Sequence, residues 1–377
     1  MKYVDEFRDG ILAANIVASI MHEVKLEHTY RLMEFCGGHT HALSRYGVLG
    51  MLPANVQMIH GPGCPVCVLP IGRIDFAIRL ALEHDVILCS YGDCLRVPAS
   101  DGMSLLKAKA RGADVRMVYS ALDAFQAAVK NPQRQVVFFA IGFETTTPPT
   151  ASIIKQARAA GLKNFSVLCN HVLTLPAMEA ILAKPDGVPL DGFVGPAHVS
   201  TVIGSEPYQL IAQRYHKPVV IAGFEPLDML QSILMLVRQV NEGRAEVENE
   251  FTRAVTPQGN RKAQALVDEV FEVRESFEWR GLGALPVSGL KIRPEFIDFD
   301  AEARYPDLVY RSVPDNKACE CGAILRGEKR PQECKIFGTV CTPENPVGSC
   351  MVSAEGACAA HYTYGRFRES AQFGAES

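Results

Sequence analysis

The stretch VVFFAIGFETTTPP, residues 136–149, is the most informative part of the chain for its fold. It opens with a run of β-branched, aromatic and aliphatic residues, which is typical of a buried strand. A glycine ends the run, polar turn residues follow, and residues 151–160 then show helical spacing. A strand, a glycine turn and a helix in this order form the repeating unit of an α/β fold.

The same order recurs on both sides of this stretch. Further strand candidates are residues 31–35, 56–60, 86–89, 115–119, 166–169, 192–194 and 219–222. Helical patterns lie between them at residues 71–84, 121–130, 206–215 and 227–240. Because strands separated by helices pair in parallel, the sequence predicts an α/β fold with two Rossmann-like parallel-sheet domains that face a cleft.

We expect four parts along the chain. Apolar residues recur at helical spacing through residues 4–24, so residues 1–28 are expected to form a helix that packs on the body of the protein. Residues 29–130 and 131–242 are expected to form two successive four-strand α/β domains. Residues 243–377 are expected to form a C-terminal domain, helical at first and irregular where Pro, Gly and Cys become frequent.

The composition excludes several classes of function. The 377 residues include 38 basic and 42 acidic side chains and are 48% hydrophobic, which indicates a globular protein without a nucleic-acid-binding surface. No apolar run reaches the roughly eighteen residues of a membrane helix, and the acidic N-terminal sequence is unlike a secretory signal. We therefore expect a cytoplasmic protein that contacts neither membrane nor nucleic acid. The motifs GxxxxGKS/T, GxGxxG, HExxH and GxSxG do not occur, which argues against standard nucleotide sites, common zinc peptidases and α/β-hydrolases.

Polar and metal-binding side chains follow nearly every predicted strand. Parallel strands end at one edge of a sheet, and open α/β sheets bind ligands at that edge. If both sheets turn these edges toward each other, the side chains share one cleft. They are Cys36, His39, His41, Cys64, Cys67, Asp93, Glu144, His171, His198 and Glu225. Each motif taken singly also fits a plain turn or a helix cap.

The twelve cysteines are unevenly placed, and six of them lie within residues 319–358. Cytoplasmic thiols are kept reduced, so metal or redox chemistry explains such a cluster better than a disulfide scaffold. The spacing Cys-x-Cys-x12-Cys-x6-Cys-x8-Cys-x7-Cys matches neither a zinc ribbon nor the bacterial ferredoxin run. Four ligands of a [4Fe-4S] cluster plus one redox-active pair account for all six, and structural zinc is the alternative.

The upstream cysteines include a CxxC motif. Cys64 and Cys67 precede a helix start, which lowers the pKa of a thiol, and such a pair can cycle between dithiol and disulfide. Cys36 lies in a glycine-flanked turn with His39 and His41, and thiolate together with imidazole suits iron, zinc or copper. A catalytic Cys–His nucleophile is the rival interpretation of this turn.

Five motifs together resemble those of the hydrogenase maturation protein HypD family, and the resemblance covers essentially the whole chain. The motifs are CGGHTH at 36–41, GPGCPVC at 61–67, GFETTTP at 142–148, GPAHVS at 195–200 and CTPENPVGSCMVSAEGACAA at 341–360. The resemblance implies two α/β domains and a C-terminal helical or irregular domain that carries a [4Fe-4S] cluster. It also implies an assembly scaffold with redox activity rather than a conventional enzyme.

On this scaffold the Fe(CN)2CO moiety of [NiFe]-hydrogenases would be assembled before its transfer to the hydrogenase large subunit. The resemblance implies that a small HypC-type chaperone holds the iron together with this chain. Cyanide would come from a HypE-type partner, after a HypF-type protein has made it from carbamoyl phosphate.

The resemblance assigns the site residues. Cys36 would be the iron-site thiolate with His39 beside it, and Cys64 and Cys67 would form the redox-switchable pair nearby. By similarity to ferredoxin–thioredoxin reductases, the cluster ligands would be Cys319, Cys334, Cys341 and Cys358, and the second redox pair would be Cys321 and Cys350. Electrons would pass from the cluster through the second pair to the first. Glu144 and His198 are candidates for orienting ligands or relaying protons.

Two other functions stay open at this point. A stand-alone iron–sulfur thiol–disulfide reductase would use the cluster and the CPVC motif on diffusible substrates. A zinc-stabilised binding module would have no redox role, and metal analysis distinguishes it from both other functions.

Overall fold

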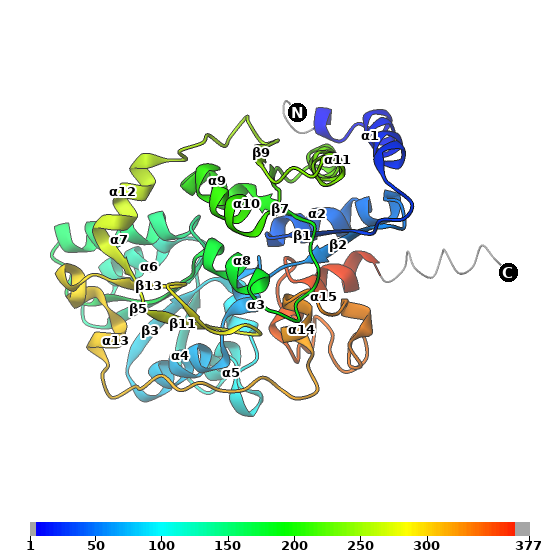
Figure 1. Cartoon of the computed structure of the whole chain (residues 1–377). Helices are drawn as coiled ribbons and strands as arrows, with labels where there is room; N and C mark the ends of the chain where they lie inside the picture. The colour runs from blue at the N-terminus through cyan, green and yellow to red at the C-terminus, as the bar shows by residue number, and fades with distance from the viewer. Residues whose placement is uncertain (1–4, 366–377) are drawn as a thin grey trace.

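Two parallel sheets organise the computed structural model, which describes residues 5–365 (Figure 1). Sheet A has the strand order β2–β1–β7–β8–β9, sheet B has the order β4–β3–β5–β6, and all neighbouring strands in both are parallel. The strands of sheet A are β1 (Tyr30–Glu34), β2 (Val56–His60), β7 (Gly192–Pro196), β8 (Val219–Ala222) and β9 (Val247–Asn249). Those of sheet B are β3 (Val86–Ser90), β4 (Asp114–Met117), β5 (Gln135–Gly142) and β6 (Phe165–His171).

Helices connect and cover the strands. The helix expected near the N-terminus is α1 (Gly10–Glu23), which packs on α11 (Pro226–Glu242). The other α-helices are α2 (Gly37–Arg45), α3 (Pro65–Val68), α4 (Ile71–Glu83), α5 (Leu105–Ala110), α6 (Ala121–Lys130), α7 (Thr147–Ala159), α8 (Thr174–Leu182), α9 (Ala197–Ile203), α10 (Gln209–Tyr215), α12 (Arg261–Val270), α13 (Ala301–Arg304), α14 (Cys321–Leu325) and α15 (Ala357–Ala360). Shorter 3-10 turns are η1 (Asp5–Phe7), η2 (Val48–Met51), η3 (Gly92–Arg96), η4 (Ser100–Gly102), η5 (Glu206–Tyr208), η6 (Pro294–Phe299), η7 (Pro331–Glu333) and η8 (Ser349–Met351), and a π-helical turn, η9, spans His361–Gly365.

The α/β class with two parallel sheets is confirmed, but the expected assignment of strands to sheets is wrong. Residues 29–130 and 131–242 do not each build one sheet. After β1 and β2 the chain leaves sheet A, builds all of sheet B from residues 86–171, and returns to sheet A at β7, which pairs with β1. Local patterns mark where strands form, whereas long-range packing decides which strands pair.

Three hydrophobic cores hold these layers together. One lies between sheet A and the helices α1 and α11, and a second lies between sheet B and the helices α6 and α7. The largest core contains residues of both sheets and also eight buried cysteines, which are Cys64, Cys67, Cys94, Cys321, Cys334, Cys341, Cys350 and Cys358. The C-terminal cysteine-rich segment is therefore part of the shared core of the two sheets.

The chain reaches that segment by way of two small antiparallel ribbons. β10 (Phe271–Val273) pairs with β13 (Leu290–Ile292), and β11 (Ser276–Trp279) pairs with β12 (Gly283–Pro286). Figure 1 shows the following stretch crossing beneath α4 and α5 before it reaches α14 and α15. There α15 contacts α2, and η8 contacts α3, so the end of the described chain lies against the loops that follow β1 and β2.

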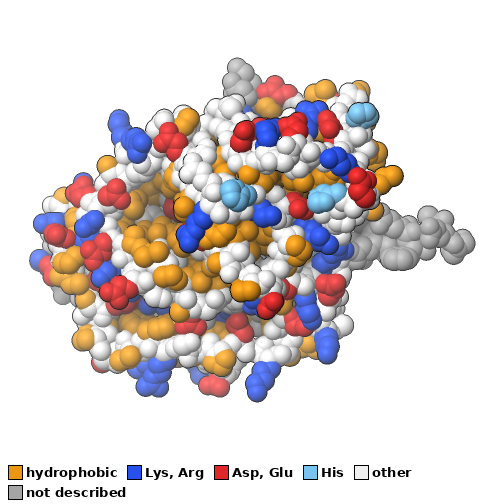
Figure 2. All heavy atoms as spheres, viewed as in Figure 1, with side chains coloured by type: hydrophobic (Ala, Val, Ile, Leu, Met, Phe, Trp, Pro, Cys, Tyr) orange, Lys and Arg blue, Asp and Glu red, His pale blue; other side chains and the backbone are white. Residues whose placement is uncertain are grey.

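The helices of residues 5–365 include none that is both long and apolar enough to cross a membrane. Acidic and basic side chains are interspersed over the face shown in Figure 2, so the charge of this face has no single sign.

A buried ion cluster fixes the C-terminal part of the chain to α4. Arg73 of α4 is 4% exposed, and its Nη2 donates to Glu302 Oε1 at 2.5 Å. Arg274 Nη2 donates to the same oxygen at 2.7 Å. Burial raises the pKa of Glu302, but the charges of Arg73 and Arg274 outweigh burial and lower it to about 2.

We predict that Glu302→Gln lowers the free energy of unfolding by about 3–5 kcal/mol, because it leaves two cations without their shared partner. Urea unfolding measures this loss, and Glu269→Gln is the control, since the exposed pair of Lys155 and Glu269 contributes under about 1 kcal/mol. The wild type should also lose stability as the pH falls from about 4.5 toward 2, and the Glu302→Gln variant should lack this component. An equally stable variant would contradict the role of the cluster.

Candidate functional site

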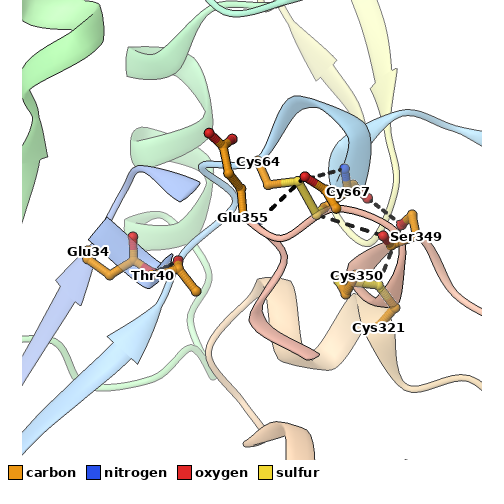
Figure 3. The surroundings of a disulfide bond; sticks show 9 residues. Glu34, Thr40, Cys64, Cys67, Cys321, Ser349, Cys350 and Glu355 are labelled. Atoms are coloured by element: carbon orange, nitrogen blue, oxygen red, sulfur yellow. Dashed lines mark hydrogen bonds between the residues drawn. A yellow bond between two sulfur atoms is a disulfide. The ribbon is translucent and has the colours of Figure 1, made fainter. Parts of the chain in front are cut away.

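The loop after β1 is fixed by a buried carboxylate. Cys36 lies at the N-terminus of α2, and Glu34, the last residue of β1, is fully buried. Glu34 Oε2 accepts a hydrogen bond from Cys36 N at 2.9 Å. Glu34 Oε1 accepts one from Thr40 Oγ1 (Figure 3). The same oxygen lies 2.9 Å from His60 Nδ1 on β2. Glu34 therefore holds Cys36, the start of α2 and the end of β2 in one arrangement.

Two glycines permit a very close approach of backbone segments around Cys36. A Cβ added at Gly63 would lie 2.3 Å from Cys36 N, and Gly37 N donates to Gly63 O at 3.2 Å. A Cβ added at Gly38 would lie 2.7 Å from the Phe224 ring. At Gly63 a Cβ would clash with backbone atoms, so only glycine fits there, whereas at Gly38 a Cβ would force the Phe224 ring to shift.

One histidine side chain lies beside the Cys36 thiol, and a second, His39, belongs to the helix that Cys36 begins. His198 Nδ1 lies 4.0 Å from Cys36 Sγ, and its ring stacks on Phe224 with a centroid distance of 3.9 Å. His39 Nε2 lies 2.9 Å from the carbonyl oxygen of Ala222, so Nε2 carries the proton and Nδ1 is an acceptor. This Nδ1 is buried and makes no hydrogen bond within residues 5–365. Burial lowers the pKa of both imidazoles, so both are neutral bases at neutral pH.

The surroundings of Cys36 favour the protonated thiol. Burial raises the pKa of Cys36 far above its usual range, and the negative charges of Glu355 and Glu34 raise it further. The backbone N–H groups of Gly38 and His39 donate to the sulfur and act in the opposite direction. A cation bound at the sulfur would favour the thiolate, so this site suits a metal ion that displaces the proton.

A disulfide lies directly beside this loop. Cys64 and Cys67 are joined, with a Cα–Cα distance of 5.2 Å, and Cys64 caps the short helix α3. The second disulfide joins Cys321 to Cys350, with a Cα–Cα distance of 6.2 Å. The structure thus pairs the four cysteines as expected from the family resemblance, while their redox role stays a prediction.

One serine lies between the two disulfides (Figure 3). Ser349 is fully buried, and its Oγ donates to Cys67 O at 2.8 Å. The same Oγ lies 3.6 Å from Cys321 Sγ, and Cys67 Sγ lies 4.0 Å from Ser349 O. Both pairs are therefore in contact with the same residue, which the sequence alone did not single out.

The four remaining C-terminal cysteines have free thiols around one cavity. They are Cys319, Cys334, Cys341 and Cys358. Apolar side chains including Ile324 and Phe337 complete the lining of this cavity. Burial raises the pKa of Cys358, and the charges of the other three thiols raise it further, which shows that the four lie within electrostatic range.

These thiols fit a group that is bound by several thiolates at once. Four soft donors in an apolar cavity are the donor set of a [4Fe-4S] cluster. Within residues 5–365, no three His, Cys, Asp or Glu side chains are grouped so as to hold a metal ion. The four thiols therefore surround a space and do not form a preformed site for a single ion.

Other predicted cleft residues have structural contacts. Both oxygens of Glu144 accept hydrogen bonds at 2.8 Å from Thr174, one from its N and one from its Oγ1, so Glu144 caps α8. Burial raises the pKa of Glu144. His171 lies 2.9 Å from Thr150 Oγ1, and Glu225 pairs with Arg8 and caps α11. Of the two acid–base candidates, the structure places His198 next to Cys36 and Glu144 at a helix N-terminus.

Glu34 and Ser349 are site residues that the sequence reasoning missed. Glu34 stands two residues before Cys36 at the end of a predicted strand, which is a signal that was available. Ser349 gave no local signal, because its importance depends on a contact with a residue 282 positions away.

Comparison with known proteins confirms the resemblance. Residues 11–365 match the HypD family, described as "Hydrogenase formation hypA family". "Hydrogenase maturation factor HypD" of Cupriavidus necator is 68% identical over 374 residues, which is 98% of this chain and 98% of that protein. "Hydrogenase expression/formation protein HupD" of Azotobacter chroococcum is 66% identical over 375 residues, covering 98% and 99%. "Hydrogenase maturation factor HypD" of Escherichia coli is 46% identical over 369 residues, covering 97% and 98%.

We predict that Glu355→Gln makes Cys36 react with iodoacetamide at least about threefold faster at pH 9, because removal of a nearby negative charge lowers the thiol pKa. Peptide mass spectrometry of the metal-free protein follows Cys36 separately from the other thiols. Glu355→Asp keeps the charge and should react at the wild-type rate. Equal alkylation rates in all three proteins would show that the charge of Glu355 does not affect the pKa of the Cys36 thiol.

Proposed function

Because the chain belongs to the HypD family of hydrogenase maturation factors, we propose that it is the scaffold on which the Fe(CN)2CO moiety of [NiFe]-hydrogenases is assembled. The observation that carries this proposal is the buried Cys36 thiol, with a neutral imidazole 4.0 Å away and a disulfide beside its loop. A scaffold of this kind binds and releases its iron cargo, so it is not a conventional enzyme.

Cys36 would bind the iron through its sulfur. Thiolate is a soft donor that suits low-spin iron with cyanide and carbon monoxide ligands. The raised pKa of the thiol couples binding to proton release, and neutral His198 is close enough to accept that proton. His39 Nδ1 offers a second buried acceptor near the same loop.

A small HypC-type chaperone would supply the further thiolate that the iron needs. In this proposal a HypE-type protein delivers cyanide that a HypF-type protein has made, and the finished moiety passes to the hydrogenase large subunit. In this proposal the work takes place in the cytoplasm, where free thiols such as these are kept reduced.

The two cysteine pairs would bring reducing equivalents to the iron site. A [4Fe-4S] cluster held by Cys319, Cys334, Cys341 and Cys358 would supply single electrons when bound. A reduced Cys321/Cys350 dithiol can then exchange with the Cys64–Cys67 disulfide. One S–S bond forms, one breaks, and two protons move to the new thiols. Opening the Cys64–Cys67 bond next to Gly63 would change the packing on the Cys36 loop.

Burial supports this route over the alternative of a stand-alone thiol–disulfide reductase. Cys64 and Cys67 are 3% and 0% exposed, and Cys321 and Cys350 are 2% and 1% exposed. A diffusible disulfide needs access to a sulfur atom, which these values do not offer. The burial therefore favours exchange within the protein.

The test of the function is infrared spectroscopy on the complex with the small chaperone, purified without oxygen. We predict that Cys36→Ala removes the cyanide and carbon monoxide bands of the iron and keeps the visible absorbance and the roughly four irons of the cluster. Cys89→Ala, in β3 of sheet B, is the matched control and should keep the bands. Surviving bands in Cys36→Ala would overturn the role of Cys36, and zinc in place of the four irons would overturn the cluster.

We also predict that Ser349→Ala slows exchange between the two pairs by about tenfold, because it removes a hydroxyl whose hydrogen bonds are worth about 1 kcal/mol or more. After a pulse of a one-electron reductant, rapid alkylation and mass spectrometry report which cysteines are reduced. In the variant, Cys321 and Cys350 should be labelled long before Cys64 and Cys67. Ser353→Ala is a control at a nearby buried serine. Labelling of both pairs at the wild-type rate would show that Ser349 does not assist the exchange.

A further inference from the structure

Arg280 is a buried cation, and two of its guanidinium nitrogens make no hydrogen bond within residues 5–365. It follows β11 directly and is 4% exposed. Its Nε lies 3.1 Å from Asp315 Oδ1, yet neither Nε nor Nη2 makes a hydrogen bond within residues 5–365. A guanidinium stays charged under all ordinary conditions, and buried donors without acceptors cost free energy. Such a side chain therefore indicates a neighbouring anion that the polypeptide itself does not supply.

Arg280 lies between the two cysteine regions. Its backbone N donates to Val68 O at 2.8 Å, directly after Cys67. The next residue, Gly281, packs so closely on the residue after Cys321 that an added Cβ would lie 2.7 Å from Gly322 Cα. The acidic partner Asp315 stands four residues before Cys319. The Arg280 backbone thus lies between the two cysteine regions, and its guanidinium is paired with the segment that leads into Cys319.

The electrostatics agree with this position. Burial lowers the pKa of Arg280, while Asp315 and the Cys319 thiol raise it by favouring the charged form. Cys319 is the most exposed of the four thiols, and the other three are buried. Arg280 is therefore within electrostatic range of the thiol that is least shielded by protein.

We propose that Arg280 is a positioning residue for the [4Fe-4S] cluster, donating to the sulfur side of the Cys319 ligand and raising the reduction potential of the cluster. This inference rests on the proposed function, in which the four thiols hold the cluster. Four thiolates give a [4Fe-4S] cluster a net negative charge, which reduction increases. A buried cation stabilises the reduced form more than the oxidised form, and charge and hydrogen bonds near the sulfurs set the potentials of such clusters.

A second cation near the thiols offers a comparison. Lys329 acts electrostatically on Cys334, but its side chain is 39% exposed and paired with Glu320. Water and its partner screen this charge, so Lys329 should affect the cluster little. Arg280 is also paired, with Asp315, but it is 4% exposed, so water screens its charge far less. We therefore expect Arg280, and not Lys329, to control the reduction potential of the cluster.

The experiment is a redox titration of the anaerobically purified full chain, followed by electron paramagnetic resonance of the reduced cluster. Arg280→Met should lower the midpoint potential so that, at a fixed potential, the ratio of reduced to oxidised cluster falls by about tenfold, or 59 mV. Arg280→Lys should stay close to the wild type. Asp315→Asn removes the counter-charge of Arg280 and should shift the potential upward, and Lys329→Met is the surface control with little shift.

Opposite shifts for Arg280→Met and Asp315→Asn would support the proposal, since general loosening of the site would not change sign. An unchanged potential in Arg280→Met, with full iron content, would overturn it. If Arg280→Met fails to fold or to keep its iron, the midpoint potential of the Asp315→Asn variant is the deciding measurement. An unchanged potential in that variant overturns the proposal. A wild type without a [4Fe-4S] signal would overturn the proposed cluster as well, whereas a cluster of unmoved potential overturns only the role of Arg280.

Discussion

The structure depends on the contact between the Gly63 backbone and Cys36. An added Cβ at Gly63 would lie 2.3 Å from Cys36 N, so this contact exists only because residue 63 has no side chain. On one side it brings the Cys64–Cys67 disulfide to the loop that carries the Cys36 thiol. On the other side, Cys67 meets Ser349 and, through it, the Cys321–Cys350 disulfide. The Cys36 loop, the Cys64–Cys67 disulfide and the Cys321–Cys350 disulfide thus form one chemical unit.

Buried charges keep that unit in place, and nearly all of those described here have a partner. Glu34 receives hydrogen bonds from the Cys36 loop and from β2, and Glu302 joins α4 to the C-terminal part of the chain. Removal of one member of such a pair is costly, because a low-dielectric interior does not solvate the charge left behind. Arg280 differs, since part of its donor capacity is unused. Because a buried charge without partners is costly, the unused donors of Arg280 make it a candidate for contact with an anionic group.

Much of the fold was predictable from the sequence, because strands and helices leave local patterns. The strand at residues 136–141 and the helix after it are present as β5 and α7. Sheet membership was not predictable, since β1 pairs with β7 across a whole inserted sheet and no local pattern encodes that choice. Within the site, the cysteine pairing followed the family resemblance, and the structure adds that Glu144 accepts two hydrogen bonds from Thr174 at the start of α8. Residues whose role comes from distant contacts, such as Ser349, need the three-dimensional structure.

The central claim is that Cys36 binds the iron cargo while a separate [4Fe-4S] cluster occupies the four-thiol cavity. Anomalous X-ray diffraction at the iron edge, on crystals of the anaerobic complex with the small chaperone, tests it most directly. The account predicts one isolated iron bonded to Cys36 Sγ and a compact group of irons among Cys319, Cys334, Cys341 and Cys358. An isolated iron elsewhere in the complex, or a single metal ion in the four-thiol cavity, would contradict it.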